Sequence, residues 1–211
     1  TVSGALTMNI VVGDGETAVI SRRAVDNAVL VNAQVCGTPT AGTTVKRIVV
    51  GGSTGTNVVI LDFANGTFAP GYGTGSGTAG VAVDLVSGSN DAVKIRGSGS
   101  ADTFTVGADG LAINTDTIKD ITVANVDALT VTLGAGNDVF SASGGYGTGA
   151  TYATAITVYG GDGNDIISGG TGADTLSGGP GNDTLRGAVD AALDTAADIL
   201  NGDDGDDTFD C

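Results

Sequence analysis

The sequence predicts an all-β protein: a right-handed parallel β-solenoid of stacked coils that continues into a C-terminal β-roll. Short alternating apolar segments recur along the chain, glycine-rich turns separate them, and nine-residue units repeat without a gap near the C-terminus. Alternation with a period of two places one set of side chains inward and the other toward solvent, and glycine tolerates tight corners. The expected unit is therefore strand, turn and strand.

The clearest repeats begin at Gly160. Three nonapeptides follow one another, GGDGNDIIS (160–168), GGTGADTLS (169–177) and GGPGNDTLR (178–186). A fourth copy starts at Gly187, is interrupted by AVDAALDT and resumes as AADILN, and GDDGDDTFD (202–210) forms a fifth. The alanine-rich interruption has apolar residues at helical spacing and could form one helical turn, although a helix this short is marginal.

Decayed copies extend toward the N-terminus in the same phase. Asp138 and Asp102 occupy the aspartate position of LGAGNDVFS (133–141) and GSGSADTFT (97–105), at whole multiples of nine residues from Asp165. Weaker copies are VSGSNDAVK (86–94), GSTGTNVVI (52–60) and VGDGETAVI (12–20). Strands are expected at 8–12, 46–50, 81–85, 92–96, 128–132 and 155–159. Two similar connections, 68–83 and 143–158, are interpreted as excursions from the coil.

The charge of the chain is strongly negative and carried almost wholly by aspartate. There are 24 acidic against 8 basic residues, a net charge of −16, and Glu16 is the only glutamate. So acidic a surface repels phosphate backbones, which argues against a nucleic-acid partner. No apolar stretch approaches a membrane span and the N-terminus lacks signal-peptide features, so no membrane insertion is expected.

The repeated turns favour calcium as the bound ion. Backbone carbonyls converge in stacked glycine turns, and each turn adds an aspartate carboxylate at a fixed position. Ca²⁺ accepts six to eight oxygen ligands in flexible geometry, whereas softer metals prefer His or Cys. The chain has no His and two cysteines, Cys36 and Cys211, which suit neither a zinc site nor a disulfide framework. A single bridge within or between chains stays open.

The three tandem nonapeptides resemble the Gly-Gly-x-Gly-x-Asp-x-U-x unit of the repeats-in-toxin (RTX, haemolysin-type) calcium-binding family. The resemblance implies that Ca²⁺ lies between turns two repeats apart. One edge of the roll would use Asp165, Asp183 and Asp207, and the opposite edge Asp174 and Asp198. The implied metal ligands are Gly161, Gly163, Asp165, Gly170, Gly172, Asp174, Gly179, Gly181, Asp183, Asp198 and Asp207.

An alternative is that the aspartates only cap turns by accepting backbone hydrogen bonds. This alternative is the favoured one for Asp91, Asp102 and Asp138, while Asn57 and Thr17 supply no charge in the weakest copies. We therefore expect residues 1–159 to form an irregular, metal-poor solenoid and 160–211 a calcium-binding roll, together one elongated domain. Because crowded aspartates repel one another, folding of the second part should depend on Ca²⁺.

The resemblance implies a structural or adhesive domain of a secreted or surface bacterial protein. The alternative is a calcium-binding accessory module of a larger secreted enzyme. No enzymatic activity is expected in the chain itself, which lacks His and a Gly-x-Ser-x-Gly motif. Lys94 and Arg96 beside Asp91 are more simply explained as exposed strand positions than as a lyase site.

Besides calcium, the expected contacts are end-to-end self-association and cell-surface or polysaccharide binding. An ice-binding face would need threonine to recur at one register of the solenoid. Thr130 and Thr132 fit locally, but no longer threonine ladder is expected from the sequence.

Overall fold

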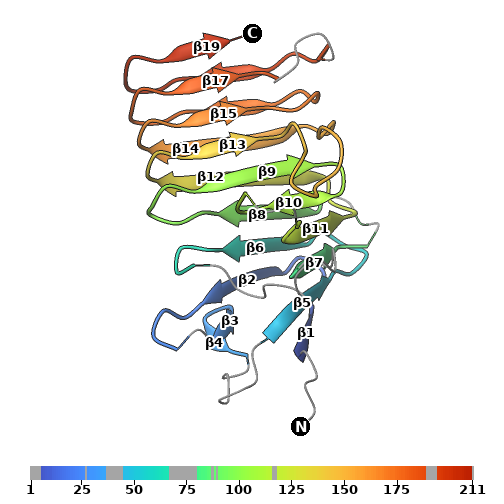
Figure 1. The fold of residues 1–211 in the computed structure, drawn as a ribbon. Coiled ribbons are helices and arrows are strands. Elements are labelled where there is room, and N and C mark those ends of the chain that lie inside the picture. Colours follow the sequence, from blue (N-terminus) through green and yellow to red (C-terminus); the bar gives the residue numbers. More distant parts are fainter. Residues whose placement is uncertain are drawn as a thin grey trace.

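The computed structural model describes residues 6–26, 28–36, 45–66, 80–86, 88, 90–115, 118–188 and 194–210. These residues form strands and turns with no helix among them, and so no segment of the described chain is a helix able to span a membrane. Two sheets of mostly parallel strands face each other along the whole molecule (Figure 1). The predicted all-β solenoid architecture is confirmed.

The ten-stranded sheet, sheet A, contains in spatial order β1 (Leu6–Val11), β5 (Val45–Gly51), β7 (Val81–Asp84), β11 (Ile121–Ala124), β10 (Gly110–Ala112), β9 (Thr103–Gly107), β13 (Val139–Ser141), β15 (Ile166–Ser168), β17 (Thr184–Arg186) and β19 (Thr208–Asp210). The nine-stranded sheet, sheet B, contains β18 (Ile199–Asn201), β16 (Thr175–Ser177), β14 (Ile156–Asp162), β12 (Ala128–Ala135), β8 (Ala92–Arg96), β6 (Val58–Asp62), β2 (Thr17–Arg22), β3 (Val29–Val31) and β4 (Gln34–Val35).

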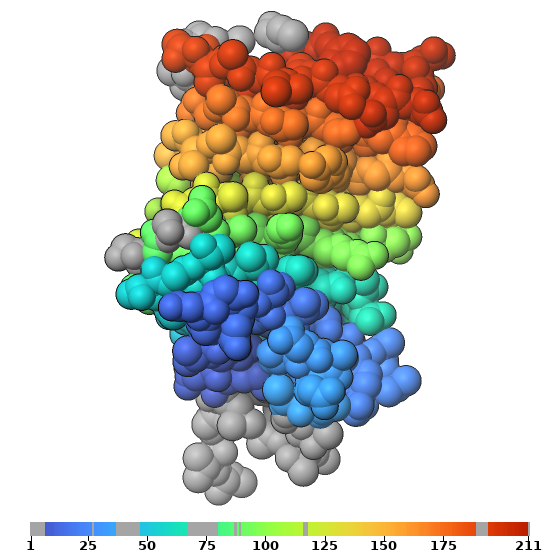
Figure 2. Space-filling model, turned by 180° about the vertical axis from the view of Figure 1, so that it is seen from behind, coloured from blue at the N-terminus to red at the C-terminus, as the bar shows by residue number. Residues whose placement is uncertain are grey.

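At most turns the chain crosses from one sheet to the other, so the coils stack along the molecule; an exception is β2–β3–β4, whose strands pair antiparallel within sheet B. Figure 2 shows the coils as bands of colour from the blue N-terminal end to the red C-terminal end. Strand β14 spans the boundary at residue 160 between the two predicted parts, and both sheets continue across it. All six strands expected from the apolar alternation are present, shifted by a few residues at their ends.

The core is a set of in-register apolar ladders between the two sheets. In sheet A, Phe104 pairs with Phe140, Phe140 with Ile167, and Ile167 with Leu185. Matching ladders run through sheet B, and the side chains of both sets are almost fully buried. The core contains few aromatic residues, because Val, Ile and Leu side chains fill most of the space between the two sheets.

A three-strand meander, which was not expected from the sequence, interrupts this regularity. Strand β10 pairs antiparallel with both β9 and β11, while β11 returns to pair in parallel with β7. Strands β8 and β12 remain direct neighbours in sheet B. Sheet A is therefore two strands wider than sheet B at this coil.

The outer face of sheet B carries a short threonine ladder, which does not persist along the sheet. Thr130, Thr157 and Thr175 are in register on β12, β14 and β16. The next positions in the same file are Lys94 and Ile199. The ladder thus covers three strands and ends at residues that differ in charge and polarity.

Several expectations fall on residues that the structure does not describe. They are most of the predicted helical turn at 188–195, most of the excursion at 68–83, and Cys211. Cys36, beside β4, is a free cysteine. The second excursion is described, and it packs against the β9–β10 turn, where Gly107 and Thr151 form an isolated bridge.

Replacing Phe140 by Ala should destabilise the protein by about 3–5 kcal/mol, because it leaves a cavity in a fully buried ladder. Val139 precedes it on the same strand and is exposed, so Val139→Ala is a matched control expected to change the free energy of unfolding by less than about 0.5 kcal/mol. Urea denaturation in calcium-saturated buffer measures both. Equal losses for the two variants would show that the ladder is not the core.

Candidate metal centre

An aspartate ends many of the turns and stands immediately before the strand that follows. Turns leading from sheet B into sheet A form what we call the first edge (left in Figure 1), and turns leading from sheet A into sheet B form the second edge. The first edge carries Asp102, Asp138, Asp165, Asp183 and Asp207 before β9, β13, β15, β17 and β19. The second edge carries Asn57, Asp91, Asp127, Asp174 and Asp198 before β6, β8, β12, β16 and β18.

The aspartates of the first edge form an unbroken ladder. The Oδ1 atoms of Asp138, Asp165, Asp183 and Asp207 each accept the backbone N–H of the aspartate one coil nearer the N-terminus. The N–H groups of Asp102, Asp138, Asp165 and Asp183 donate at 2.7, 2.8, 2.7 and 2.9 Å. The structure therefore brings together the predicted partners Asp165, Asp183 and Asp207 and continues the same contact down to Asp102.

The ladder of the second edge is broken. Asp174 donates its N–H to Asp198 Oδ1 at 2.8 Å, so the predicted pair is adjacent. One coil earlier the position before β14 is Ala155, which has no carboxylate, and Ile156 donates to Asp174 instead at 3.0 Å. Farther along, Asn57 donates to Asp91 at 2.7 Å.

The second carboxylate oxygen is the unusual feature of these ladders. The Oδ2 atoms of Asp91, Asp138, Asp165 and Asp183 are buried and have no hydrogen-bond partner among the described residues. A buried ionised oxygen without a donor is costly unless a cation or a proton compensates it. These four oxygens are thus placed where a positively charged ligand would stabilise the fold.

Burial raises the pKa of these carboxyl groups. The pKa of Asp165 rises from 3.8 to about 6, chiefly because burial disfavours the charged form, with repulsion from Asp138 and Asp183 adding to it. Burial likewise raises the pKa of Asp174 to about 6. The pKa values of Asp138 and Asp183 are raised for the same reason.

The first glycine of each repeat leaves room for the aspartate of that repeat. A methyl group on Gly160 would overlap both Asp165 Oδ2 and the carbonyl oxygen of Gly178 in the next coil of the same edge. On the second edge, a methyl group on Gly169 would overlap Asp174 Oδ2 and the carbonyl of Gly187. A carboxylate oxygen and a carbonyl oxygen thus converge beside each glycine.

The second and fourth residues of the first-edge turns have positive φ angles. The values are 111° and 135° for Gly161 and Gly163, and 107° and 149° for Gly179 and Gly181. The carbonyl oxygens of Gly161 and Gly163 occupy the space that a Cβ atom would need at Gly179 and Gly181 in the next coil. The carbonyls of these two predicted ligands therefore face the gap between coils.

Gly170 and Gly172, also predicted as ligands, lie in different surroundings. On their N-terminal side they meet Tyr152 and Thr154 of the excursion loop instead of another glycine turn. The N–H of Thr171 donates to the carbonyl oxygen of Tyr152 at 2.9 Å. The predicted turn containing Asp174 is consequently flanked by a repeat turn only on its Asp198 side.

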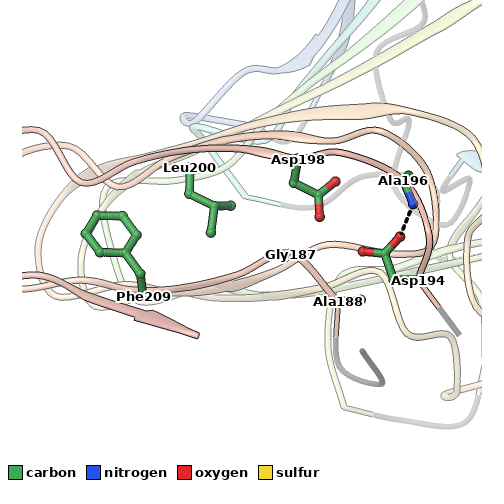
Figure 3. A pocket seen from close by; sticks show the side chains of 7 residues that line it. All are labelled: Gly187, Ala188, Asp194, Ala196, Asp198, Leu200 and Phe209. Atoms are coloured by element: carbon green, nitrogen blue, oxygen red, sulfur yellow. Dashed lines mark hydrogen bonds between the residues drawn. The ribbon is translucent and has the colours of Figure 1, made fainter. Parts of the chain in front are cut away.

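The interrupted fourth copy ends beside a hollow of about 510 Å³ near the C-terminal end (Figure 3). Asp194, from the interruption, and Asp198 both point into it, and Leu200 and Phe209 line its apolar part. Burial raises the pKa of Asp198, and the neighbouring Asp194 raises it further. The interruption thus adds a carboxylate where regular copies have a glycine.

Side chains alone do not make a metal cluster here. Within the part of the chain that the structure describes, no group of three or more His, Cys, Asp or Glu side chains is suitably placed. Any site must therefore combine one or two carboxylates with turn carbonyls. Such an all-oxygen set suits Ca²⁺, which accepts carbonyls and tolerates irregular geometry.

Sequence reasoning missed one set of residues on the first edge. Asn137, Asn164 and Asn182 form a second ladder, in which each Oδ1 accepts the backbone N–H of the equivalent residue in the next coil. The signal was present as asparagine at the fifth position of three copies that share an edge. Reading the copies in alternation, rather than consecutively, would have shown it.

Comparison with known protein families gives one match. The model of the RTX calcium-binding nonapeptide repeat, in four copies, matches residues 78–110 and 157–191. The first of these ranges lies in the part expected to be poor in metal. No curated protein and no solved structure matches the chain.

Replacing Gly160 by Ala should destabilise the protein by about 1–3 kcal/mol, because the methyl group has no space between the Asp165 carboxylate and the next coil. Gly99 lies in another turn of the same edge, and no atom lies within 4 Å of the position that its Cβ would take, so Gly99→Ala is the control and should be close to neutral. Thermal denaturation of the two variants makes the comparison. A harmless Gly160→Ala would mean that the carboxylate does not occupy this space.

The calcium-free protein should lose stability as pH rises. The folded chain holds protons on Asp165 and Asp174 up to pH of about 6, whereas the unfolded chain releases them near the ordinary value of 3.8. The stabilisation that these protonated carboxyl groups provide is complete below pH 3.8 and is lost as the pH rises through about 6. Melting temperatures of calcium-depleted protein between pH 4 and pH 8 should therefore fall; a rise over this range contradicts the assignment.

Proposed function

Because the chain carries RTX calcium-binding nonapeptide repeats, we propose that it is a calcium-stabilised structural or adhesive β-solenoid domain of a secreted or surface protein. RTX repeats bind Ca²⁺ structurally, and proteins that contain them are generally secreted. The supporting observation in this chain is the row of buried, unpartnered Oδ2 atoms on stacked aspartates. Catalysis is not part of the proposal.

The residues that would hold calcium on the first edge are Asp165, Asp183 and Asp207 with the carbonyls of the intervening glycine turns. Their backbone already aligns successive carboxylates through the Oδ1 ladder, which leaves Oδ2 available to the ion. On the second edge the same role falls to Asp174 and Asp198. Bound calcium supplies the positive charge that offsets the repulsion between these carboxylates.

Two aspartates that the sequence favoured as simple turn caps share this arrangement. Asp138 and Asp91 are buried and have an unpartnered Oδ2, as Asp165 and Asp183 do. We therefore extend the proposed calcium sites to the turns that contain Asp138 and Asp91. The N-terminal part would then be less poor in metal than the weakness of its repeats suggests.

The affinity expected for such sites fits an extracellular protein. Calcium modules of this kind bind with dissociation constants of about 10⁻⁴ to 10⁻³ M, above the calcium concentrations inside cells. In this range the aspartate ladders would remain unneutralised before export and would fill outside. The domain would then become fully stable only after export, when calcium fills the sites.

An accessory role beside a catalytic domain is the second candidate. It is favoured by the same features, since a calcium-set solenoid can support a neighbouring enzyme domain as well as an adhesive one. Sequencing the flanking parts of the gene distinguishes the two: an adjacent enzyme domain supports the accessory role, and further repeats or a surface anchor support the structural one. Self-association and polysaccharide contact stay sequence-based predictions.

Calcium should raise the melting temperature, whereas Mg²⁺ should not, and circular dichroism spectra with and without chelator should differ. A calcium concentration 100-fold above the dissociation constant stabilises by about 2.7 kcal/mol per site. Asp183→Asn should lower both the calcium stoichiometry and this gain, because Asp183 lies between two coils of the first edge while the amide oxygen can still accept the ladder hydrogen bond.

Asp109→Asn is the control for this experiment, since it removes the same charge from an exposed turn away from both ladders. It should bind as much calcium as the unchanged protein in isothermal titration calorimetry. Identical spectra and melting temperatures with calcium and with chelator would refute the proposed function.

A further inference from the structure

The two edges of the solenoid differ in a way that the aspartates do not explain. At the residue before the aspartate, the first edge has Asn137, Asn164 and Asn182, while the second edge has Ala173 and Ala197 in its last two turns. Asparagine offers a neutral acceptor at this position and alanine offers none. The last two turns of the second edge therefore lack the acceptor that joins the equivalent turns of the first edge.

The asparagine ladder complements the aspartate ladder between the same coils. Asn164 N–H donates to Asn137 Oδ1 at 2.9 Å, and the adjacent Asp138 N–H donates to Asp165 Oδ1 at 2.8 Å. The two bonds run in opposite directions along the stack. Each pair of first-edge turns is thus joined by reciprocal side-chain contacts at two consecutive residues.

Only one of these two ladders is weakened when no cation is present. The aspartate ladder places like charges in successive coils, and their mutual repulsion opposes stacking in the calcium-free protein. The asparagine ladder carries no charge and its hydrogen bonds form with or without metal. It continues into the last coil, where Asp206 N–H donates to Asn182 at 2.9 Å.

Two further features oppose stacking of the turns on the second edge. Its turn before β14 lacks an aspartate, and the turn that contains Asp198 is lengthened by the interruption after Gly187. A longer connection costs more conformational entropy to order. Stacking of the second-edge turns therefore depends more on the free energy that calcium binding supplies.

We propose that the asparagine ladder holds the first-edge turns in stacked register before calcium binds, so that the first edge fills at lower calcium concentration than the second. The proposal rests on the proposed function, because it concerns the order in which the same calcium sites fill. Preorganised ligands bind more tightly since less ordering is required on binding. Asn137, Asn164 and Asn182 are positioning residues, not calcium ligands.

A calcium titration of the full chain followed by NMR tests this order. The backbone amide signals of Asp165 and Asp183 report the first edge, and that of Asp174 reports the second. The first-edge signals should reach their midpoint at a calcium concentration several-fold lower than the Asp174 signal. Equal midpoints, or the reverse order, would overturn the proposal.

Two uncharged substitutions sharpen the test. The double substitution Asn164→Ala and Asn182→Ala removes the acceptors for the N–H groups of Asn182 and Asp206. Losing one such hydrogen bond weakens binding roughly fivefold, so the calcium concentration at the first-edge midpoint should rise about fivefold or more. Ala173→Asn places an acceptor opposite the Ala197 N–H and should lower the second-edge midpoint. Neither change alters the net charge, so general electrostatic effects are excluded.

The failure of this proposal differs from failure of the proposed function. If no amide signal responds to calcium, the calcium sites themselves are refuted. If all signals respond but the asparagine variants leave both midpoints unchanged, calcium binding stands and the positioning role of the asparagines is refuted. Circular dichroism of each variant at saturating calcium verifies that the fold is retained.

Discussion

Parallel in-register stacking is the constraint on which the rest of the structure depends. Neighbouring strands are held about 4.8 Å apart by their backbone hydrogen bonds, so equivalent residues of successive coils must lie close together. For apolar residues this closeness builds the core ladders. For aspartate it brings like charges together. The Oδ1 atom of each buried ladder aspartate accepts a backbone N–H, while the Oδ2 atom faces a gap lined by other oxygen atoms.

Glycine and aspartate at the two ends of a turn form one interlocking unit. The carboxylate of Asp165 occupies the space that a side chain at position 160 would need, and the same holds for Asp174 and Gly169. Neither residue can therefore change without affecting the other. The nonapeptide pattern therefore reflects the packing of the carboxylate against the glycine turn as well as metal binding.

Much of the fold could be predicted from the sequence because the signal is periodic. The alternation at 128–132 and the tandem turns from Gly160 follow from the pleat of a strand and the conformational freedom of glycine. The β9–β10–β11 meander could not be predicted, because Gly110–Ala112 is too short to show a period and its antiparallel pairing depends on partners distant in the chain.

The candidate site was predictable in its residue types but not in its extent. The resemblance to the RTX nonapeptide implied that Asp165, Asp183 and Asp207 share one edge, and the structure places them in successive turns of the first edge. The burial of Asp138 and Asp91 depends on the coils stacked against them, which a single repeat does not reveal. The function of asparagine at the fifth position likewise emerges only when alternate copies are brought side by side.

The meander gives the solenoid unequal contour lengths on its two faces. Two additional strands in sheet A add about 10 Å of stack height that sheet B does not share. On the N-terminal side of the meander, β1 and β5 are inclined to the strands of the C-terminal coils (Figure 1). Sheet B gains β3 and β4 beyond β2 at the N-terminal end, so the described sheets differ by a single strand, ten against nine, and the excess of sheet A at the meander is largely offset there.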